Sequence, residues 1–153
     1  MLTLIEKSYL THKELMDEMY NLENAMSKME GAKFGDDASP LVHTFGDGIY
    51  IRQITMAENL CVVSKLHKTT HPYFVLKGDV SVLTEEGVVR IKAPYWGMTK
   101  AGTKRVLQIH EETIWITVHA TNETDLEKIE DELIAKTYNE LPEDIRLKIE
   151  GKS

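Results

Sequence analysis

Apolar side chains recur along the first part of the chain at spacings of three and four, which places them on one face of a helix. They are Leu15, Met19, Leu22, Met26 and Met29. Thr11 and Glu14 have the spacing of a capping box at the start of this helix, and Gly31 is a natural end. The stripe has to be covered, either by the rest of the chain or by a helical seam between subunits.

Residues 32–48 are rich in glycine, proline and small polar side chains, and we predict a connector with turns. From Ile49 onward, short apolar runs are separated by turn sequences such as TEEG and KAGT. The runs are IYIRQITM, NLCVVSKLH, PYFVLKGDVSVL, GVVRIKA, RVLQIH and TIWITVH. Short strands at close intervals, with no helices between them, predict an antiparallel sandwich or barrel.

After His119 the helical pattern returns. Thr124 and Glu127 have the spacing of a second capping box, before another apolar stripe. A last short helix is predicted from Pro142 to just before Gly151, because proline favours the first position of a helix.

The chain has 153 residues, of which 42% are apolar and 28% charged, as is usual for one globular domain. A chain of this size buries roughly 70% of its unfolded surface without needing disulfides or a structural metal. The single cysteine, Cys61, lies in an apolar run and is predicted to be buried. We predict one mainly β domain over residues 1–153, with a helical segment (1–31), a barrel (46–121) and C-terminal helices (122–153).

The formal net charge of −7 argues against binding of a nucleic-acid duplex across the surface. No apolar run is long enough to span a bilayer, and the amino terminus lacks a signal-peptide pattern, so we expect a cytoplasmic protein without membrane partners. The strand region has the opposite charge balance. Residues 61–78 and 88–110 contain no Asp or Glu, yet hold eight of the 18 Lys and Arg and three of the six His.

Four stretches of the strand region resemble the cupin family, in the order expected of its double-stranded β-helix. They are GDGIYIRQITM, SKLHKTTHPYFVLKGDVSV, the APYWG turn and KAGTKRVLQIHEETIWITVHAT. The resemblance covers residues 46–121 and is closest to the small cupin-like proteins encoded by tailed bacteriophages and prophages. It implies a jelly-roll barrel and, for a phage-encoded protein, a location in the host cytoplasm.

The resemblance also implies which positions would bind a metal. Metal-binding cupins carry two histidines separated by one residue, a glutamate four residues after the second, and a third histidine in a later motif. Here those positions fall on Lys65, His67, His71 and Arg105. Two cations beside the ligands would oppose a divalent metal by Coulomb repulsion, so we expect no cofactor. A metal held by His67 and His71 with waters or another subunit's group is the alternative.

Alternation along strands places Arg52 and Tyr73 on the same inner face as the motif positions. The sequence shows no acidic partner for these cations, and buried cations without carboxylates are costly unless an anion joins them. Arginine grips phosphate or carboxylate in bidentate fashion, lysine acts as a point charge, and aromatic rings can stack on a planar ligand. The candidate ligand-binding residues are Arg52, Lys65, His67, His71, Tyr73, Trp96, Lys104 and Arg105. His110 and His119 are assigned to the surface or the core edge.

These observations favour a non-enzymatic binding protein that captures a small anionic, nucleotide-like molecule. The phage resemblance implies that the molecule is a host immune signal, which sequestration alone would counter. One alternative is an enzyme, either a metal-dependent lyase, isomerase or oxygenase, or a metal-free hydrolase with His67 or His71 as general base. The other is a homo-oligomer built on the N-terminal stripe that binds a host protein or has a structural role.

Overall fold

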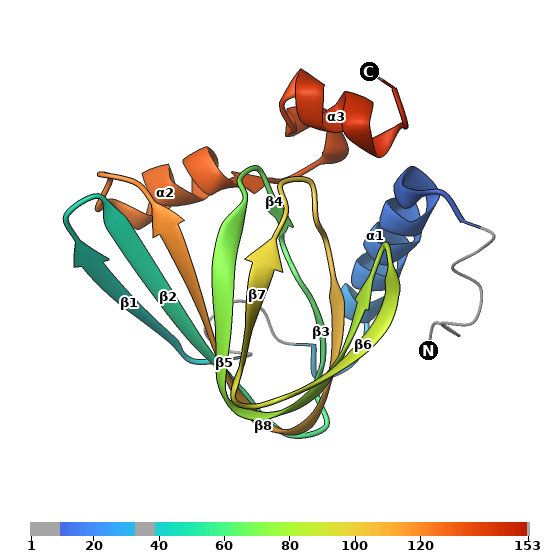
Figure 1. Ribbon diagram of the computed structural model, residues 1–153. Coiled ribbons are helices and arrows are strands. Elements are labelled where there is room, and N and C mark those ends of the chain that lie inside the picture. The colour runs from blue at the N-terminus through green and yellow to red at the C-terminus, as the bar shows by residue number, and fades with distance from the viewer. Residues whose placement is uncertain (1–9, 33–38, 153) are drawn as a thin grey trace.

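The computed structural model describes residues 10–32 and 39–152, which form a strongly curved antiparallel sheet with helices near its ends (Figure 1). The elements are α1 (His12–Ser27), β1 (Leu41–Gly46), β2 (Ile49–Met56), β3 (Cys61–Val63), β4 (Leu66–His67), β5 (His71–Thr84), β6 (Gly87–Lys92), β7 (Tyr95–Thr99), β8 (Val106–Ala120), α2 (Leu126–Leu133), β9 (Ile134–Ala135), η3 (Tyr138–Glu140) and α3 (Glu143–Ile149). The prediction of a mainly β fold with helices at both ends is confirmed.

The two long strands β5 and β8 pair with each other and connect the two halves of the barrel. One half has the order β1-β2-β8-β5, with β7 also on β5, and the other half adds β3 to β8 and β6 to β5. The runs RVLQIH and TIWITVH form the single strand β8, because Glu111 and Glu112 continue the strand with exposed side chains. Strand β1 lies inside the predicted connector and was missed.

Gly78 marks the bend of β5. The register of β5 against β8 shifts between Val75 and Val80, and Gly78 has φ +109° at this point. A Cβ added there would lie 2.3 Å from Thr113 Oγ1 and 2.7 Å from the Glu112 carbonyl oxygen. Only glycine combines this backbone conformation with so close an approach of the neighbouring strand.

Helix α1 begins with the predicted capping box: the Glu14 amide donates to Thr11 Oγ1 at 3.1 Å, and the Thr11 amide donates to Glu14 Oε2 at 2.8 Å. Leu15 and Met19 pack against Leu83 and Val106 of the barrel. The N-terminal half of the predicted stripe is therefore covered by the chain itself, whereas Met29 is 65% exposed.

The C-terminal elements cover the end of the barrel where β4 lies (Figure 1). Strand β9 pairs with β4, so that His67 lies opposite Ile134. Helix α2 is capped by Asp125, whose side chain accepts hydrogen bonds from two backbone amides, and not by Thr124 as predicted. Pro142 precedes α3 at its N-cap, one position before the predicted place.

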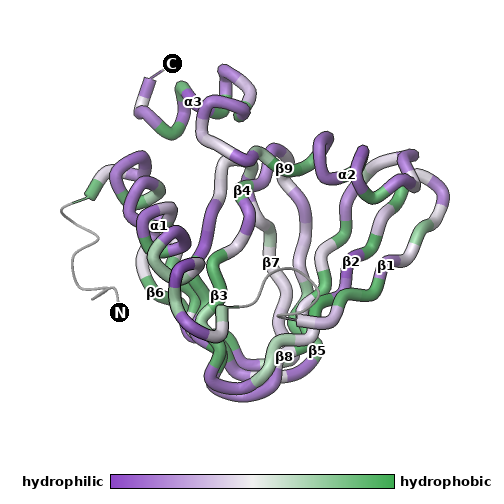
Figure 2. Tube along the Cα trace, turned by 180° about the vertical axis from the view of Figure 1, so that it is seen from behind, coloured by the Kyte–Doolittle hydropathy of each residue, from purple (hydrophilic) through white to green (hydrophobic). Residues whose placement is uncertain are grey.

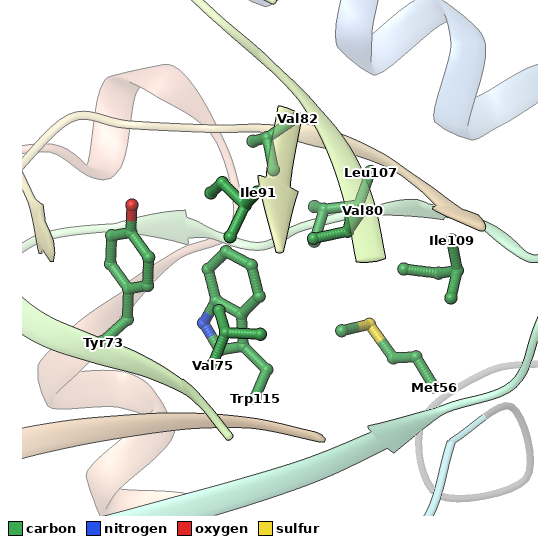
Figure 3. Packing of buried hydrophobic residues seen from close by; sticks show 9 residues of the cluster. All are labelled: Met56, Tyr73, Val75, Val80, Val82, Ile91, Leu107, Ile109 and Trp115. Carbon is green, nitrogen blue, oxygen red and sulfur yellow. The ribbon is translucent and has the colours of Figure 1, made fainter. Parts of the chain in front are cut away.

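The main hydrophobic core fills the barrel between β5, β6 and β8. Its buried residues are Met56, Tyr73, Val75, Val80, Val82, Ile91, Leu107, Ile109 and Trp115. Tyr73 lies at one end of this cluster and Ile109 and Met56 lie at the other (Figure 3). The apolar stretches follow the strands, while α2 is mainly hydrophilic (Figure 2).

The exposure of Cys61 and the length of the helices bear on two further expectations. Cys61, predicted to be buried, is exposed on β3, because its run of apolar residues lies at an edge of the sheet. Within residues 10–32 and 39–152, no helix is both long and apolar enough to cross a membrane.

Candidate functional site

Three histidines converge at the end of the barrel that is nearest to Tyr73. The ring centroids of His67 and His71 are 4.5 Å apart, those of His71 and His119 are 4.3 Å apart, and those of His67 and His119 are 6.2 Å apart. His71 begins β5 and His119 is near the end of β8. Since Tyr73 pairs with Thr117 across these antiparallel strands, His71 and His119 lie two residues further along on the same face.

Each of these rings has a buried nitrogen that no hydrogen bond satisfies within the part of the chain that the structure describes. The atoms are His67 Nδ1, His71 Nε2 and His119 Nδ1. The opposite nitrogen of His71 lies 3.0 Å from the Thr69 carbonyl, so Nδ1 donates, and Nε2 carries a lone pair in the neutral ring. A buried polar atom without a partner costs about 1–3 kcal/mol, which makes these nitrogens candidates for ligand contact.

Burial and neighbouring cations keep the three imidazoles in the neutral form. Burial is the largest cause that lowers the pKa of His119 to about 3, and the charges of His71 and Arg52 add to it. The pKa of His67 is lowered well below its ordinary value, first by burial and then by His71, His119, Arg52 and Arg105. Burial and Arg105 also lower the pKa of His71, although its hydrogen bond to Thr69 opposes them.

Arg105 lies near the histidines and directly precedes β8, with its guanidinium carbon 4.9 Å from the centre of the Tyr73 ring. Its Nε atom is buried and has no hydrogen-bond partner among the described residues. Burial lowers the pKa of Arg105, while the charges of Tyr73, Glu85 and Tyr95 raise it. Arg105 is therefore a partly desolvated cation beside an aromatic ring.

Tyr73 is fixed from several sides and lies beside Arg105. Its ring stacks on Trp115 with 4.7 Å between centroids. A Cβ at Gly97 would lie 2.7 Å from the Tyr73 hydroxyl oxygen, so glycine at this position of β7 makes room for the phenol. The Tyr73 ring thus contacts Trp115 on one side and lies 4.9 Å from the Arg105 guanidinium carbon.

Arg52 approaches the cluster from the neighbouring strand β2. It lies opposite Thr117 in the register, on the same inner face as His119. Its charge contributes to lowering the pKa of both His67 and His119. The structure thus brings together Arg52, His67, His71, Tyr73 and Arg105 of the predicted set.

Three predicted residues lie away from the cluster. Lys65 is exposed and forms an ion pair with Glu130 of α2. The ammonium of Lys104 is buried, 3.0 Å from Glu23 of α1, and donates to the Ser64 carbonyl at 2.8 Å. The expectation that Lys65 points into the barrel without an acidic partner is wrong, because Glu130 comes from a helix that strand alternation does not place. Lys104, proposed as a ligand-binding residue, is instead paired with Glu23.

The third is Trp96. Its side chain is 68% exposed, and it lies opposite the exposed Phe74 on the outer face of the sheet. Trp96 was expected to stack on a planar ligand, but on this face it lies outside the barrel and away from the histidines.

His119 is the residue that the sequence analysis missed. It is 4% exposed, not at the surface, and stands inside the barrel. The signal was present in the alternation of TIWITVH, since Trp115 and Thr117 are buried on the same face and His119 continues that series. His110 does lie elsewhere, 2.7 Å from Ser81 Oγ in the other half of β8.

The resemblance to metal-binding cupins implies a metal at the motif positions, and the residues here can be tested against that expectation. Neutral imidazoles are good ligands for Zn, Fe, Cu or Ni. Among the described residues, however, no group of three or more His, Cys, Asp or Glu side chains is arranged to hold a metal ion. Arg52 and Arg105 also add positive charge beside the imidazoles. As arranged, these residues do not fit a resident divalent metal.

Comparisons with protein-family models and with curated proteins give no match. Solved structures do match. Salicylate 1,2-dioxygenase from Pseudoaminobacter salicylatoxidans has a TM-score of 0.50 at 10% identity, over 69% of this chain and 31% of that one. KdgF from Halomonas sp. has a TM-score of 0.50 at 8% identity, over 60% and 87%.

A cupin superfamily protein from Desulfitobacterium hafniense is also similar, with a TM-score of 0.48 at 10% identity over 59% of this chain and 84% of that one. The two structures with a TM-score of 0.50 share their fold with this chain, so the jelly-roll fold expected from the sequence is confirmed. The structural neighbours include a cupin superfamily protein, and the chain has a cupin-like jelly-roll fold.

Proposed function

We propose that this chain is a non-enzymatic binding protein whose barrel takes one small anionic molecule at the three histidines. One observation carries the proposal: buried imidazole nitrogens that have no hydrogen-bond partner among the described residues lie in the field of Arg52 and Arg105. A molecule that bears phosphate or carboxylate would accept hydrogen bonds from the Arg105 guanidinium. Its negative charge would also offset the positive charge of the arginines, which now disfavours protonation of the imidazoles.

The charges that act on the histidines support an anion as the ligand. The pKa shifts of His67 and His119 arise from burial, from the other histidines and from arginine, and every one of these causes lowers the pKa. Glu85 raises the pKa of Arg105. An incoming anion would add negative charge beside the histidines.

The same pKa shifts argue for binding rather than turnover. A general base works best when its pKa is close to the operating pH. An imidazole with a pKa of about 3, such as His119, is a weak base at neutral pH. Capture of a ligand needs only affinity, which this arrangement can supply without chemistry.

The nucleotide-like character of the ligand is the finer part of the proposal. The site offers arginine for a phosphate group, and Tyr95, which is 42% exposed, lies 6.1 Å from Tyr73 between ring centroids. Tyr95 stacks on Tyr73 with one side of its ring and is partly open to solvent, so it is an aromatic side chain on which a base could stack. Sequestration of a host immune signal is the use that the phage resemblance implies.

Calorimetric titration with inorganic phosphate and with AMP tests the proposal. We expect one site per chain, and AMP recovered unchanged. Arg105→Ala and His71→Gln should each weaken binding at least tenfold. Lys65→Ala is the matched control, since it removes a cation whose partner is Glu130 outside the cluster, and it should bind as the unsubstituted chain does.

Three results would overturn the proposal: no binding of either probe at millimolar concentration, conversion of AMP, or equal binding by Arg105→Ala and Lys65→Ala. Elemental analysis of the purified protein addresses the enzyme alternative. A stoichiometric metal that is lost in His71→Gln would replace the anion site with a metal centre.

A further inference from the structure

The outer face of one half of the barrel carries mainly apolar side chains from one edge strand to the other. The register aligns Val42, Gln53, Ile116, Phe74 and Trp96 in one row across β1, β2, β8, β5 and β7. We call the surface formed by this row and the adjacent outward positions the outer sheet face. Alternation separates it from the inner face, where Tyr73, Val75 and Trp115 are buried.

Most of the outer sheet face carries no charged side chain. Its outward positions, 42 and 44, 51, 53 and 55, 72, 74 and 76, 96 and 98, and 114, 116 and 118, hold only apolar, Thr and Gln side chains. At one end of the face Lys77 lies opposite Ile114 in the register and pairs with Glu112 at 2.8 Å, so these two charges neutralise each other. In a chain with 28% charged residues, a surface so poor in charge across these strands is a marked exception.

Large apolar side chains on this face are open to solvent. Trp96 is 68% exposed, Leu76 58%, Val42 54%, Met98 51% and Phe74 37%. With strands about 4.8 Å apart and about 3.3 Å per residue, five strands by five residues give a flat footprint of roughly 400 Å². Contiguous apolar patches of several hundred Å² mark interaction sites.

We infer that the outer sheet face is the interface between two copies of this chain. The net charge of −7 makes two copies repel wherever charged surfaces meet, and this face brings no like charges together. A charged partner would find no complement on it. The flat footprint is about half of the ~800 Å² that a standard interface buries on each partner, before the area of the protruding side chains is counted.

The geometry of the face suits packing against itself. Two sheets pack face to face about 10 Å apart when side chains of their facing surfaces interdigitate. A two-fold axis parallel to the strands and centred on β8 would place Trp96 of each copy against Val42 on strand β1 of the other. Exposed tryptophan is the residue type that most often dominates such interfaces.

The N-terminal stripe, the other surface considered for self-association, is partly used within the chain. Leu15 and Met19 are buried against Leu83, and Met16 is buried against Leu66. What remains exposed on it is mainly Met29. This inference goes beyond the proposed anion site and does not depend on it.

Sedimentation equilibrium of the full chain from 1 to 100 µM, which spans the affinities usual for such interfaces, tests the inference. We expect a mass of twice 17.5 kDa for the unsubstituted chain. Trp96→Glu and Phe74→Glu should each raise the dissociation constant at least a hundredfold. Met29→Glu is the matched control, because it places the same charge on an exposed apolar position outside the face, and it should remain dimeric.

A monomeric chain at 100 µM would overturn the inference, as would a dimer that survives both Trp96→Glu and Phe74→Glu. A dimer that only Met29→Glu dissociates would assign the interface to the stripe. Tryptophan fluorescence gives a second readout, since Trp115 is 6% exposed and Trp96 68%. Dilution should shift the emission of the unsubstituted chain to longer wavelength, and Trp96→Phe should remove the shift.

Discussion

The imidazole of His71 packs against that of His119, with 4.3 Å between the ring centroids, although 47 positions separate them in the chain and they belong to different strands. Both side chains are buried, at 2% and 4% exposure. The antiparallel pairing of β5 with β8 creates this contact. Protonation of either ring would place a charge beside the other and beside the arginines, so the pair links the stability of the fold to pH.

The stability of the folded chain should fall as pH decreases below 6.5. The folded-state pKa values of the three histidines lie below their ordinary value of 6.5, so the unfolded chain binds protons that the folded chain does not. The contribution of His119 is therefore fully present above pH 6.5 and is lost progressively down to about pH 3. Between pH 6.5 and 5 it amounts to about 2 kcal/mol.

Urea denaturation at pH 7.5, 6.5, 5.5 and 5.0 measures this dependence. His119→Gln should flatten the loss of unfolding free energy by about 1 kcal/mol per pH unit. His12→Gln removes an imidazole from α1, outside the site, and should keep the slope of the unsubstituted chain. Equal slopes for all three proteins would show that His119 is not held neutral by the fold.

Binding of an anion at the site should be accompanied by uptake of protons. A bound anion stabilises the imidazolium form, so the pKa values of the histidines rise on binding and affinity increases as pH decreases from 8 to 6. Sulfate is a suitable probe because it does not titrate in this range. The affinity for sulfate should rise by up to tenfold for each unit by which the pH decreases, for each proton taken up.

Calorimetry in two buffers with different ionisation enthalpies counts those protons directly. The unsubstituted chain should show net uptake at pH 7, and the uptake should decrease in His71→Gln. Affinity for sulfate that does not change with pH would mean that the arginines bind the anion without the histidines.

The strands and the basic character of the barrel interior were predictable, because alternation and charge distribution are local properties of the sequence. His67, His71 and Arg105 come from positions that a linear motif can identify, and they do lie together. The partners of Lys65 and Lys104 were not predictable, since α2 and α1 supply them from 65 and 81 positions away. Alternation along TIWITVH could have predicted that His119 faces the interior, but only the pairing of β5 with β8 shows that it faces His71.

The ion pair between Lys104 and Glu23 should contribute to the attachment of α1. The ammonium of Lys104 is 3% exposed and the carboxylate of Glu23 is 45% exposed, so loss of the carboxylate leaves a buried cation. Burial already lowers the pKa of Lys104, and Glu23 opposes that shift. Glu23→Gln should therefore cost about 1–2 kcal/mol of unfolding free energy.

Lys104→Met should cost less than Glu23→Gln, because it removes the buried charge together with its need for a partner. The double variant should be no less stable than Glu23→Gln alone. Urea denaturation at pH 7 measures all three. If Glu23→Gln is as stable as the unsubstituted chain, the ion pair does not hold α1, and its packing through Leu15 and Met19 is sufficient.

Gly78→Ala should be among the most destabilising single substitutions in the chain. Its Cβ would lie 2.3 Å from Thr113 Oγ1 and 2.7 Å from Thr113 Cα, and its φ of +109° disfavours any residue with a side chain. Relief requires β5 and β8 to separate at the bend, which disturbs the pairing that brings His71 to His119. We expect a loss of at least about 3 kcal/mol.

Gly31→Ala is the matched control, because Gly31 also has a positive φ of +80° but an added Cβ would meet nothing within 4 Å. It should cost only about 1 kcal/mol, the strain of the backbone alone. Comparison of the two unfolding free energies isolates the steric part at Gly78. Equal losses would mean that the backbone conformation, and not the close approach of β8, requires glycine at the bend.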